Sequence, residues 1–178
     1  LGRLYHRVLD YVLRSVNMDA FNFLQEYLTA FLEVFIEIPG IMQFEEMGLS
    51  CIAALHPPTY VHCLEVADIS RCLAEHLGRK HPELFAEEYG YRREEVEKKL
   101  PHIYAHIYRC GLCHDFGKLA MIDSIFIYGR DLLPGEYEMI RLHTLLGAEM
   151  LEHHASTRAL SQLARTHHIW YSRKGGYP

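Results

Sequence analysis

The sequence predicts an all-α fold, a helical bundle with an N-terminal helical extension. Along most of the chain, apolar residues recur at steps of three and four, as at Leu4, Val8 and Tyr11, and this spacing builds one face of a helix. Helix breakers such as Pro39-Gly40 interrupt the pattern. No segment alternates apolar and polar residues in the manner of a half-buried strand, so helices are the expected regular structure throughout.

Capping and breaking residues set the limits of the first expected helices. Asp19 is a preferred N-cap for the second helix, which ends at Pro39-Gly40. Thr59 is expected to cap the helix that precedes Gly78, and Gly78 is expected to end that helix in the C′ position. The helices predicted in this half of the chain are residues 4–16, 20–38, 42–55 and 60–77.

Proline and glycine set the later helices in the same way. Pro101 suits the first turn of a helix that Gly117 ends, and Pro134 opens the next one. Ser156 or Thr157 is expected to cap the last helix. The segments predicted here are one or two exposed helices within 82–99, helices over 102–116, 134–154 and 157–168, an irregular stretch over 118–133, and a terminal loop over 170–178.

Composition excludes several classes of protein. The 178 residues are 49% hydrophobic and 23% charged, which is typical of a globular protein with a real core. The 18 basic and 23 acidic side chains give a net charge of −5, which is no electrostatic footprint for a DNA- or RNA-binding protein. No apolar run approaches the roughly 18 residues of a membrane span, and no signal peptide opens the chain.

The five cysteines indicate reduced thiols and a cytoplasmic protein. Their number is odd and their spacing irregular, which argues against a secreted disulfide framework. Three of them, Cys51, Cys63 and Cys72, are expected to be small buried residues.

Cys110 and Cys113 form a CxxC, a spacing that also occurs in redox and zinc sites. A redox site would need a βαβ context, which the pattern does not offer. A zinc site would need further ligands such as His102 and His106, and four ligands on one straight helix cannot surround an ion tetrahedrally. We therefore interpret the pair as packing residues.

Histidines fall on apolar faces of several expected helices. Those concerned are His62, His114, His143 and His167. The face that carries His62 also holds Val66, Ile69 and Leu73. A lone histidine on such a face is usually a core residue. Four buried imidazoles would need four separate sets of hydrogen-bond partners, whereas one metal centre accepts them all.

Three neighbours strengthen the metal interpretation. Asp115 directly follows His114 and could bridge two ions, and His168 directly follows His167. Lys118 could place a cation on a phosphate oxygen. Taken singly, Lys118 is a surface lysine, and a His-Asp pair is a coincidence in a chain with 13 histidines.

These residues resemble the HD-domain metal-dependent phosphohydrolases. The ordered pattern H…HD…H…HH is matched by His62, His114-Asp115, His143 and His167-His168. Residues 114–178 are most similar to the HD-GYP subfamily of cyclic-di-GMP phosphodiesterases, through the strings HDFGKLAMID, LLPGEYEMIRLHTLLGAEML, LARTHH and GGYP. The resemblance covers residues 59–178, about two-thirds of the chain.

The resemblance implies an HD-domain helical bundle with two divalent metal ions, iron or manganese being favoured and zinc, nickel or magnesium being alternatives. One ion would be bound by His62, His114 and Asp115, and the other by Asp115, His143, His167 and His168. Asp115 would bridge them, a hydroxide activated by both would attack phosphorus, and Lys118 would neutralise the phosphate oxygen. Asp115 and Lys118 are thus the expected catalytic residues.

The terminal loop is expected to meet the substrate together with Lys118. It begins directly after His167 and His168, so it starts at the expected metal site. Arg173 and Lys174 can contact phosphate, and Tyr177 in the glycine-rich turn can contact the substrate. The alternative is that the aromatic residues of the loop pack the end of the helix.

Some positions depart from the family pattern. The last ligand of the family is an aspartate in a helix beyond GYP, so we expect the C-terminal end of the domain to lie beyond Pro178. Ile169 stands where the family usually has an acidic residue, and one extra residue separates HH from GYP. Pro58 stands where some members have a glutamate for a third metal, so two metals at most are expected.

We therefore expect a helical extension over 1–55, regulatory or dimerising, and a phosphohydrolase domain over 56–178. The favoured function is hydrolysis of a cyclic dinucleotide in cytoplasmic signalling, with no DNA or RNA polymer as partner. The alternatives are another HD nucleotide or alarmone phosphohydrolase and a non-catalytic HD signalling module. Self-association into a homodimer is compatible with each.

Overall fold

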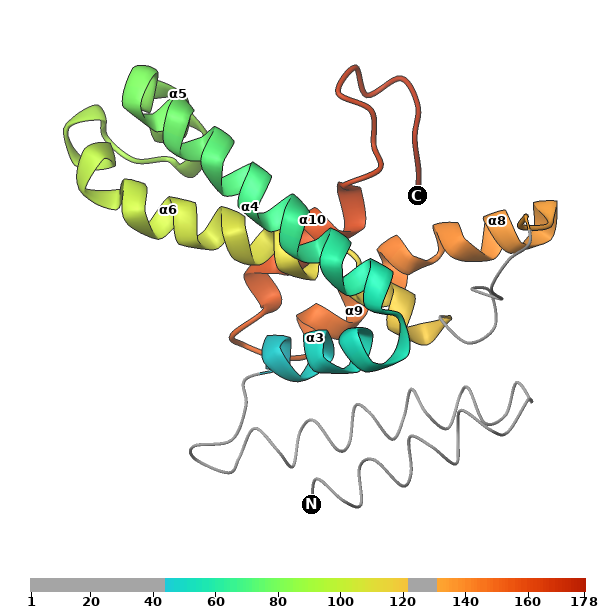
Figure 1. The fold of residues 1–178 in the computed structure, drawn as a ribbon. Helices are drawn as coiled ribbons and strands as arrows, with labels where there is room; N and C mark the ends of the chain where they lie inside the picture. The colour runs from blue at the N-terminus through green and yellow to red at the C-terminus, as the bar shows by residue number, and fades with distance from the viewer. Residues whose placement is uncertain (1–43, 122–130) are drawn as a thin grey trace.

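The computed structural model describes residues 44–121 and 131–178, and every regular element in these ranges is a helix (Figure 1). The elements are α3 (Phe44–Leu55), α4 (Pro57–Lys80), α5 (Pro82–Tyr89), α6 (Arg93–Cys113), the 3-10 helix η1 (Phe116–Ala120), α8 (Pro134–Arg141), α9 (His143–Glu152), the 3-10 helix η2 (Arg158–Leu160) and α10 (Ser161–Thr166). The all-α prediction is confirmed. The helices expected over 4–16 and 20–38 lie outside the described residues.

The two longest of the described helices, α4 and α6, lie side by side and form the frame of this part of the chain (Figure 1). Small residues on α4, among them Cys63 and Ala67, are buried in the contact. A methyl group on Gly111 of α6 would lie 2.5 Å from the Cα of Ala67, so the two backbones approach too closely there for a larger residue. This close crossing fixes the register between His62 on α4 and His114 at the end of α6.

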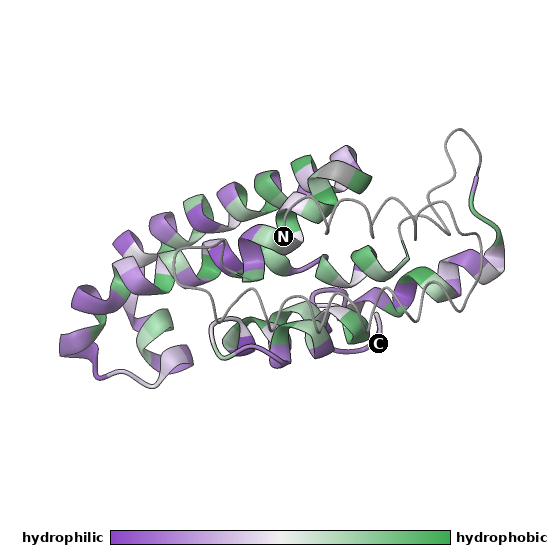
Figure 2. Ribbon diagram, turned by 90° about the horizontal axis from the view of Figure 1, so that it is seen from below, coloured by the Kyte–Doolittle hydropathy of each residue, from purple (hydrophilic) through white to green (hydrophobic). Residues whose placement is uncertain are grey.

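Two apolar clusters flank the crossing. The larger one joins α3, the end of α6, η1, α9 and α10 around Phe44, Ile52, Phe116 and Leu151. The smaller one lies where α5 folds back between α4 and α6, around Phe85 and the neighbouring aliphatic side chains. Figure 2 shows the resulting alternation of hydrophobic and hydrophilic bands along the helices. The candidate site lies next to the larger cluster, whose buried side chains support it.

The bounds of α4 differ from the expected ones. The helix begins at Pro57, and its N-cap is His56, whose Nδ1 accepts a hydrogen bond from the backbone N–H of Thr59 at 3.2 Å. Prolines are tolerated in the first turn because their missing N–H would be unpaired there. Gly78 lies inside the helix rather than at its end. A glycine suits this position because its Cα faces the ring of Tyr104, where a side chain would clash.

The bounds of α6 also differ, since the helix begins at Arg93 and runs through Pro101. A proline inside a helix removes one backbone hydrogen bond. The turns on either side of Pro101 are nevertheless held by Val96 and Ile103, which are buried against α4 and α5. Tertiary packing therefore outweighs the local preference for a helix start at the proline.

The segment predicted as one helix over 134–154 is two, α8 and α9, which meet at Leu142. The predicted cap Thr157 does not bind the following turn. Its hydroxyl instead donates to the carbonyl of Leu151 at 2.9 Å, and a 3-10 turn precedes α10. α10 ends at Thr166, so His167 and His168 lie just beyond the helix.

The face of α4 predicted to point to the core is largely exposed. Ile69 and Leu73 are 67% and 57% exposed, and Cys72 is exposed as well. The buried face of this helix consists instead of small residues, because only they allow the close approach of α6. The burial predicted for Ile69, Leu73 and Cys72 is therefore wrong.

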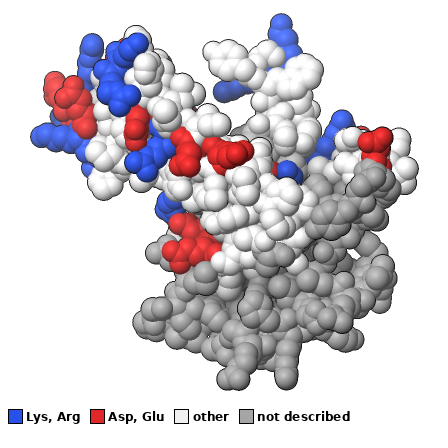
Figure 3. Space-filling view, viewed as in Figure 1, with Lys and Arg blue, Asp and Glu red and all other residues white. Residues whose placement is uncertain are grey.

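On the face shown in Figure 3, acidic and basic side chains are mixed over α4, α5 and α6 and form no basic patch. Of the helices in the described ranges, none is both long enough and apolar enough to cross a bilayer.

Candidate metal centre

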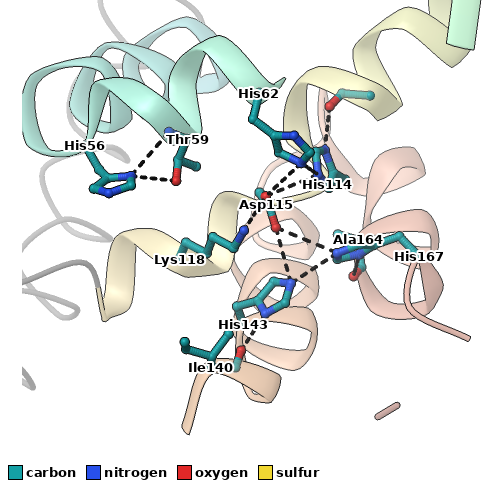
Figure 4. A network of polar contacts seen from close by, with 11 residues as sticks. His56, Thr59, His62, His114, Asp115, Lys118, Ile140, His143, Ala164 and His167 are labelled. Atoms are coloured by element: carbon teal, nitrogen blue, oxygen red, sulfur yellow. Dashed lines mark hydrogen bonds and ion pairs between the residues drawn. The ribbon is translucent and has the colours of Figure 1, made fainter. Parts of the chain in front are cut away.

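The side chains predicted to bind metal lie close together, and Figure 4 shows all of them except His168. Among the described residues they form two groups with metal-ligand spacing, one of His62, His114 and Asp115 and one of His143, His167 and His168. Within each group the ligand atoms lie within 4.8 Å of one another. The structure thus brings together the residues that the histidine pattern singled out, although His62 lies at the exposed rim rather than in the core and His143 does not line the neighbouring cavity.

Asp115 belongs to the first group and also reaches the second. Its Oδ2 is 3.6 Å from Nε2 of His62 and 3.2 Å from Nε2 of His114. Its Oδ1 is 3.2 Å from Nε2 of His143 and 3.7 Å from Nε2 of His167. One carboxylate oxygen therefore faces each group, as a bridging ligand requires.

Close backbone packing places Asp115 in this position. α6 ends at Cys113, and η1 then runs directly over the start of α9. A methyl group on Gly117 would lie 1.8 Å from the carbonyl oxygen of His143 and 2.6 Å from the backbone nitrogen of Gly147. Because glycine leaves this space open, η1 can approach α9 closely enough to bring Asp115 to His143.

Three of the imidazoles are oriented by the same local hydrogen bond. Nδ1 of His114 bonds to the carbonyl of Gly111 at 2.7 Å, and Nδ1 of His167 bonds to that of Ala164 at 2.8 Å. His143 makes the equivalent bond to Ile140. A carbonyl oxygen can only accept, so in the neutral form of each ring Nδ1 carries the proton and Nε2 presents a lone pair. Metal-binding histidines are commonly oriented in this way.

The Nε2 atoms then point at one another. Those of His143 and His167 are 3.1 Å apart, and those of His62 and His114 are 3.2 Å apart. Burial, and next the neighbouring imidazole of His114, lowers the pKa of His167 to about 3, so this ring is neutral at neutral pH. A neutral ring whose Nε2 lacks a proton presents a lone pair, and a cation stabilises such lone pairs held close together.

Asp115 itself is a buried carboxylate with 1% of its side chain exposed. Burial alone would raise its pKa, but the imidazoles of His114 and His143 in their protonated form, and the ammonium of Lys118, hold the pKa well below its usual range. Lys118 Nζ donates to Oδ2 at 2.6 Å, while Oδ1 makes no hydrogen bond with any described residue. A buried anionic oxygen without a hydrogen bond is costly unless a cation reaches it.

A cavity of about 790 Å³ opens beside this cluster, between α4, α6 and α10. The end nearest the histidine cluster is lined by His62, His114, Asp115, His167 and His168. Of the residues predicted to bind substrate, Lys118 lines the cavity, whereas Arg173, Lys174 and Tyr177 do not.

The terminal loop returns to the cluster through Tyr177. The ring of Tyr177 stacks on that of His168, with centroids 4.4 Å apart and an interplanar angle of 19°, and Arg141 lies 5.5 Å over the same ring. Gly176 permits this return, because its φ is 100° and a methyl group there would lie 2.1 Å from the carbonyl oxygen of His168. Arg173 and Lys174 are exposed.

The CxxC pair belongs to the core and to neither metal-binding group. Cys110 and Cys113 are buried, and burial raises the pKa of both thiols, that of Cys110 to about 11. Their interpretation as packing residues is confirmed.

The residues that sequence reasoning missed lie on the far wall of the cavity. They are Ser70, Glu88, Tyr89, His106 and Gln162. The sequence carries one usable signal for two of them: Ser70 lies eight residues after His62 on α4, and His106 lies eight residues before His114 at the end of α6, a spacing that falls within one broad helix stripe. Nothing in the pattern of α5 indicates that Glu88 and Tyr89 reach the same cavity.

Comparison with known proteins gives one match. The family model described as HD domain matches residues 59–176, which include every residue of the two groups. No curated protein and no solved structure matches the chain.

Proposed function

Because the chain belongs to the HD-domain family, whose members are generally metal-dependent phosphohydrolases, we propose that it hydrolyses a cyclic dinucleotide, with cyclic-di-GMP as the favoured substrate. The proposal includes a domain division, with a phosphohydrolase domain over 56–178 and a regulatory or dimerising extension over 1–55. The compartment proposed is the cytoplasm, and the role is signalling.

One observation carries the proposal: four imidazoles, those of His62, His114, His143 and His167, lie within 3.7 Å of a single buried carboxylate whose Oδ1 makes no hydrogen bond among the described residues. This donor set fits two divalent ions. His62, His114 and Asp115 would hold one, and His143, His167, His168 and Asp115 would hold the other. Imidazole and carboxylate donors without a thiolate suit iron or manganese at least as well as zinc.

Divalent ions bound here would supply Lewis-acid activation of the phosphodiester and of the attacking water. The residues of the chain would orient both. Lys118 lies at the cavity wall beside Asp115, where its ammonium can meet a non-bridging phosphate oxygen. The cavity of about 790 Å³ is within the usual range for a small-molecule site.

The strings after Asp115 support the finer assignment to a cyclic dinucleotide. The GGYP turn and the spacing of His143, His167 and His168 are those of the HD-GYP resemblance. Tyr177 of that turn lies against His168, so the loop that distinguishes this subfamily contacts the metal-facing cluster.

The test is to measure metal content and hydrolysis of cyclic-di-GMP and of bis-(p-nitrophenyl) phosphate for the wild type, Asp115→Ala and Asp68→Ala. Asp68 is a matched control because it is an exposed aspartate on α4 that lines no part of the cavity. We expect Asp115→Ala to lose both metals and all activity, while the helix content measured by circular dichroism stays nearly unchanged. Asp68→Ala is expected to behave as the wild type. An Asp115→Ala protein with two bound metals per chain would contradict the bridging role.

A further inference from the structure

The cavity continues well beyond the metal-facing cluster. On α4 its wall runs from His62 to Ser70, and on α6 it runs from His114 back to His106. Eight residues of α-helix span about 12 Å, so the far end lies a nucleotide's length away from the histidines. A third wall, formed by η2 and α10, follows the same course from His167 to Ala159.

The middle of this groove is apolar. Val66 on α4, Ile107 on α6 and Leu163 on α10 line it, with Gly111 between them. Such walls suit the faces of a flat ring system and offer no hydrogen bonds of their own.

The far end is polar and aromatic. Tyr89 and His106 lie there edge to face, with ring centroids 6.2 Å apart. Glu88 on α5, Ser70 on α4 and Gln162 on α10 complete the rim. Among the described residues, neither the carboxylate of Glu88 nor the amide of Gln162 makes a hydrogen bond or ion pair, so both are available to a ligand.

We propose that this far end is the subsite for a guanine base, with Tyr89 against the ring and Glu88 against its hydrogen-bonding edge. An ionised carboxylate only accepts, and guanine presents two adjacent N–H donors on its Watson–Crick edge. Adenine presents an acceptor nitrogen beside its amino group, which a carboxylate disfavours. The proposal rests on the proposed function, since the phosphate of the same nucleotide would lie at the histidines.

The test compares Glu88→Gln with Glu87→Gln, a matched control at an exposed neighbour on α5 that does not line the cavity. Binding of GMP and AMP to the metal-free protein is measured by calorimetry, so this readout does not depend on activity. We expect the wild type and Glu87→Gln to prefer GMP. Glu88→Gln should lose about tenfold in GMP affinity and shift toward AMP, since a glutamine can pair with adenine.

A second readout is the ratio of kcat/KM for cyclic-di-GMP to that for bis-(p-nitrophenyl) phosphate, which has no base. It should fall about tenfold in Glu88→Gln and stay constant in Glu87→Gln. If the two variants keep the same GMP-to-AMP preference as the wild type, the guanine subsite is refuted even when hydrolysis occurs. If the wild type hydrolyses no phosphodiester but its GMP preference requires Glu88, the subsite is supported and the proposed function fails.

Discussion

A single methyl group at Gly117 should disturb the candidate metal centre from outside it. In Gly117→Ala, the new Cβ would lie 1.8 Å from the carbonyl oxygen of His143, whereas real Cβ atoms essentially never approach within 3.0 Å. η1 and α9 must therefore separate by about 1.2 Å, the difference between these two distances. The three nearest contact atoms, two of His143 and one of Gly147, all belong to backbone, so no side-chain rotation can relieve the clash.

The magnitude follows from two opposing effects. Overpacking costs about 1–3 kcal/mol. The backbone of Gly117 has no positive φ, so alanine recovers about 0.4–1 kcal/mol by restricting the unfolded chain. The midpoints of the two ranges give a net loss of about 1.3 kcal/mol in the free energy of unfolding, which lowers Tm by about 3–5 °C for a chain of this size. Metal affinity should fall as well, because ligand distances are held to about 0.2 Å and Asp115 moves with η1.

The assay is thermal unfolding followed by circular dichroism, together with calorimetric titration of Mn²⁺. Gly135→Ala is the control, because nothing lies within 4 Å of a methyl group at that position. We expect the control to match the wild type in both measurements. A Gly117→Ala protein with unchanged Tm and unchanged Mn²⁺ affinity would refute the argument that this backbone contact positions Asp115.

Further expectations concern the loop and the scaffold. Tyr177→Ala should weaken Mn²⁺ binding in calorimetry while Tyr177→Phe retains it, because the phenyl ring preserves the stacking on the imidazole beneath; equal losses would assign the effect to the hydroxyl. Arg109→Lys should lower the free energy of urea unfolding by about 1–2 kcal/mol, because lysine cannot keep both the bidentate contact to Glu45 on α3 and the bond to the carbonyl of Ser156. Replacing Arg173 and Lys174 together by Ala should raise KM for cyclic-di-GMP more than for bis-(p-nitrophenyl) phosphate, and equal changes on both substrates would remove the binding role.

The positions that converge on the candidate site could be predicted because each lies on a helix or at its end. His114 closes α6 and His167 follows α10 directly, so helical spacing and the ordered histidine pattern were enough to single out these side chains. Even the Nδ1 hydrogen bonds are local, since each links a histidine to the carbonyl three residues before it. Such short-range geometry follows from helical spacing.

Features that depend on long-range packing were not predictable in the same way. Pro101 lies inside α6 because α5 folds against the helix there, and no local signal announces that contact. The core face of α4 is built of small residues, whereas a hydrophobicity pattern favours Ile69 and Leu73. The far wall of the cavity depends on where α5 returns, which only the packed structure specifies.

The ion pair between Lys118 and Asp115 has a consequence for how the site is assembled. Small metal-binding domains often cannot fold until the ion arrives, because their ligands repel or remain unpaired. Here the chain supplies its own cation: Nζ lies 2.6 Å from Oδ2 and neutralises the buried carboxylate. The domain can therefore fold before a metal binds. A metal that binds later would replace the ammonium of Lys118 as the positive partner of Asp115. A lysine released by that exchange would stay tethered one turn away, at the cavity wall where a phosphate would enter.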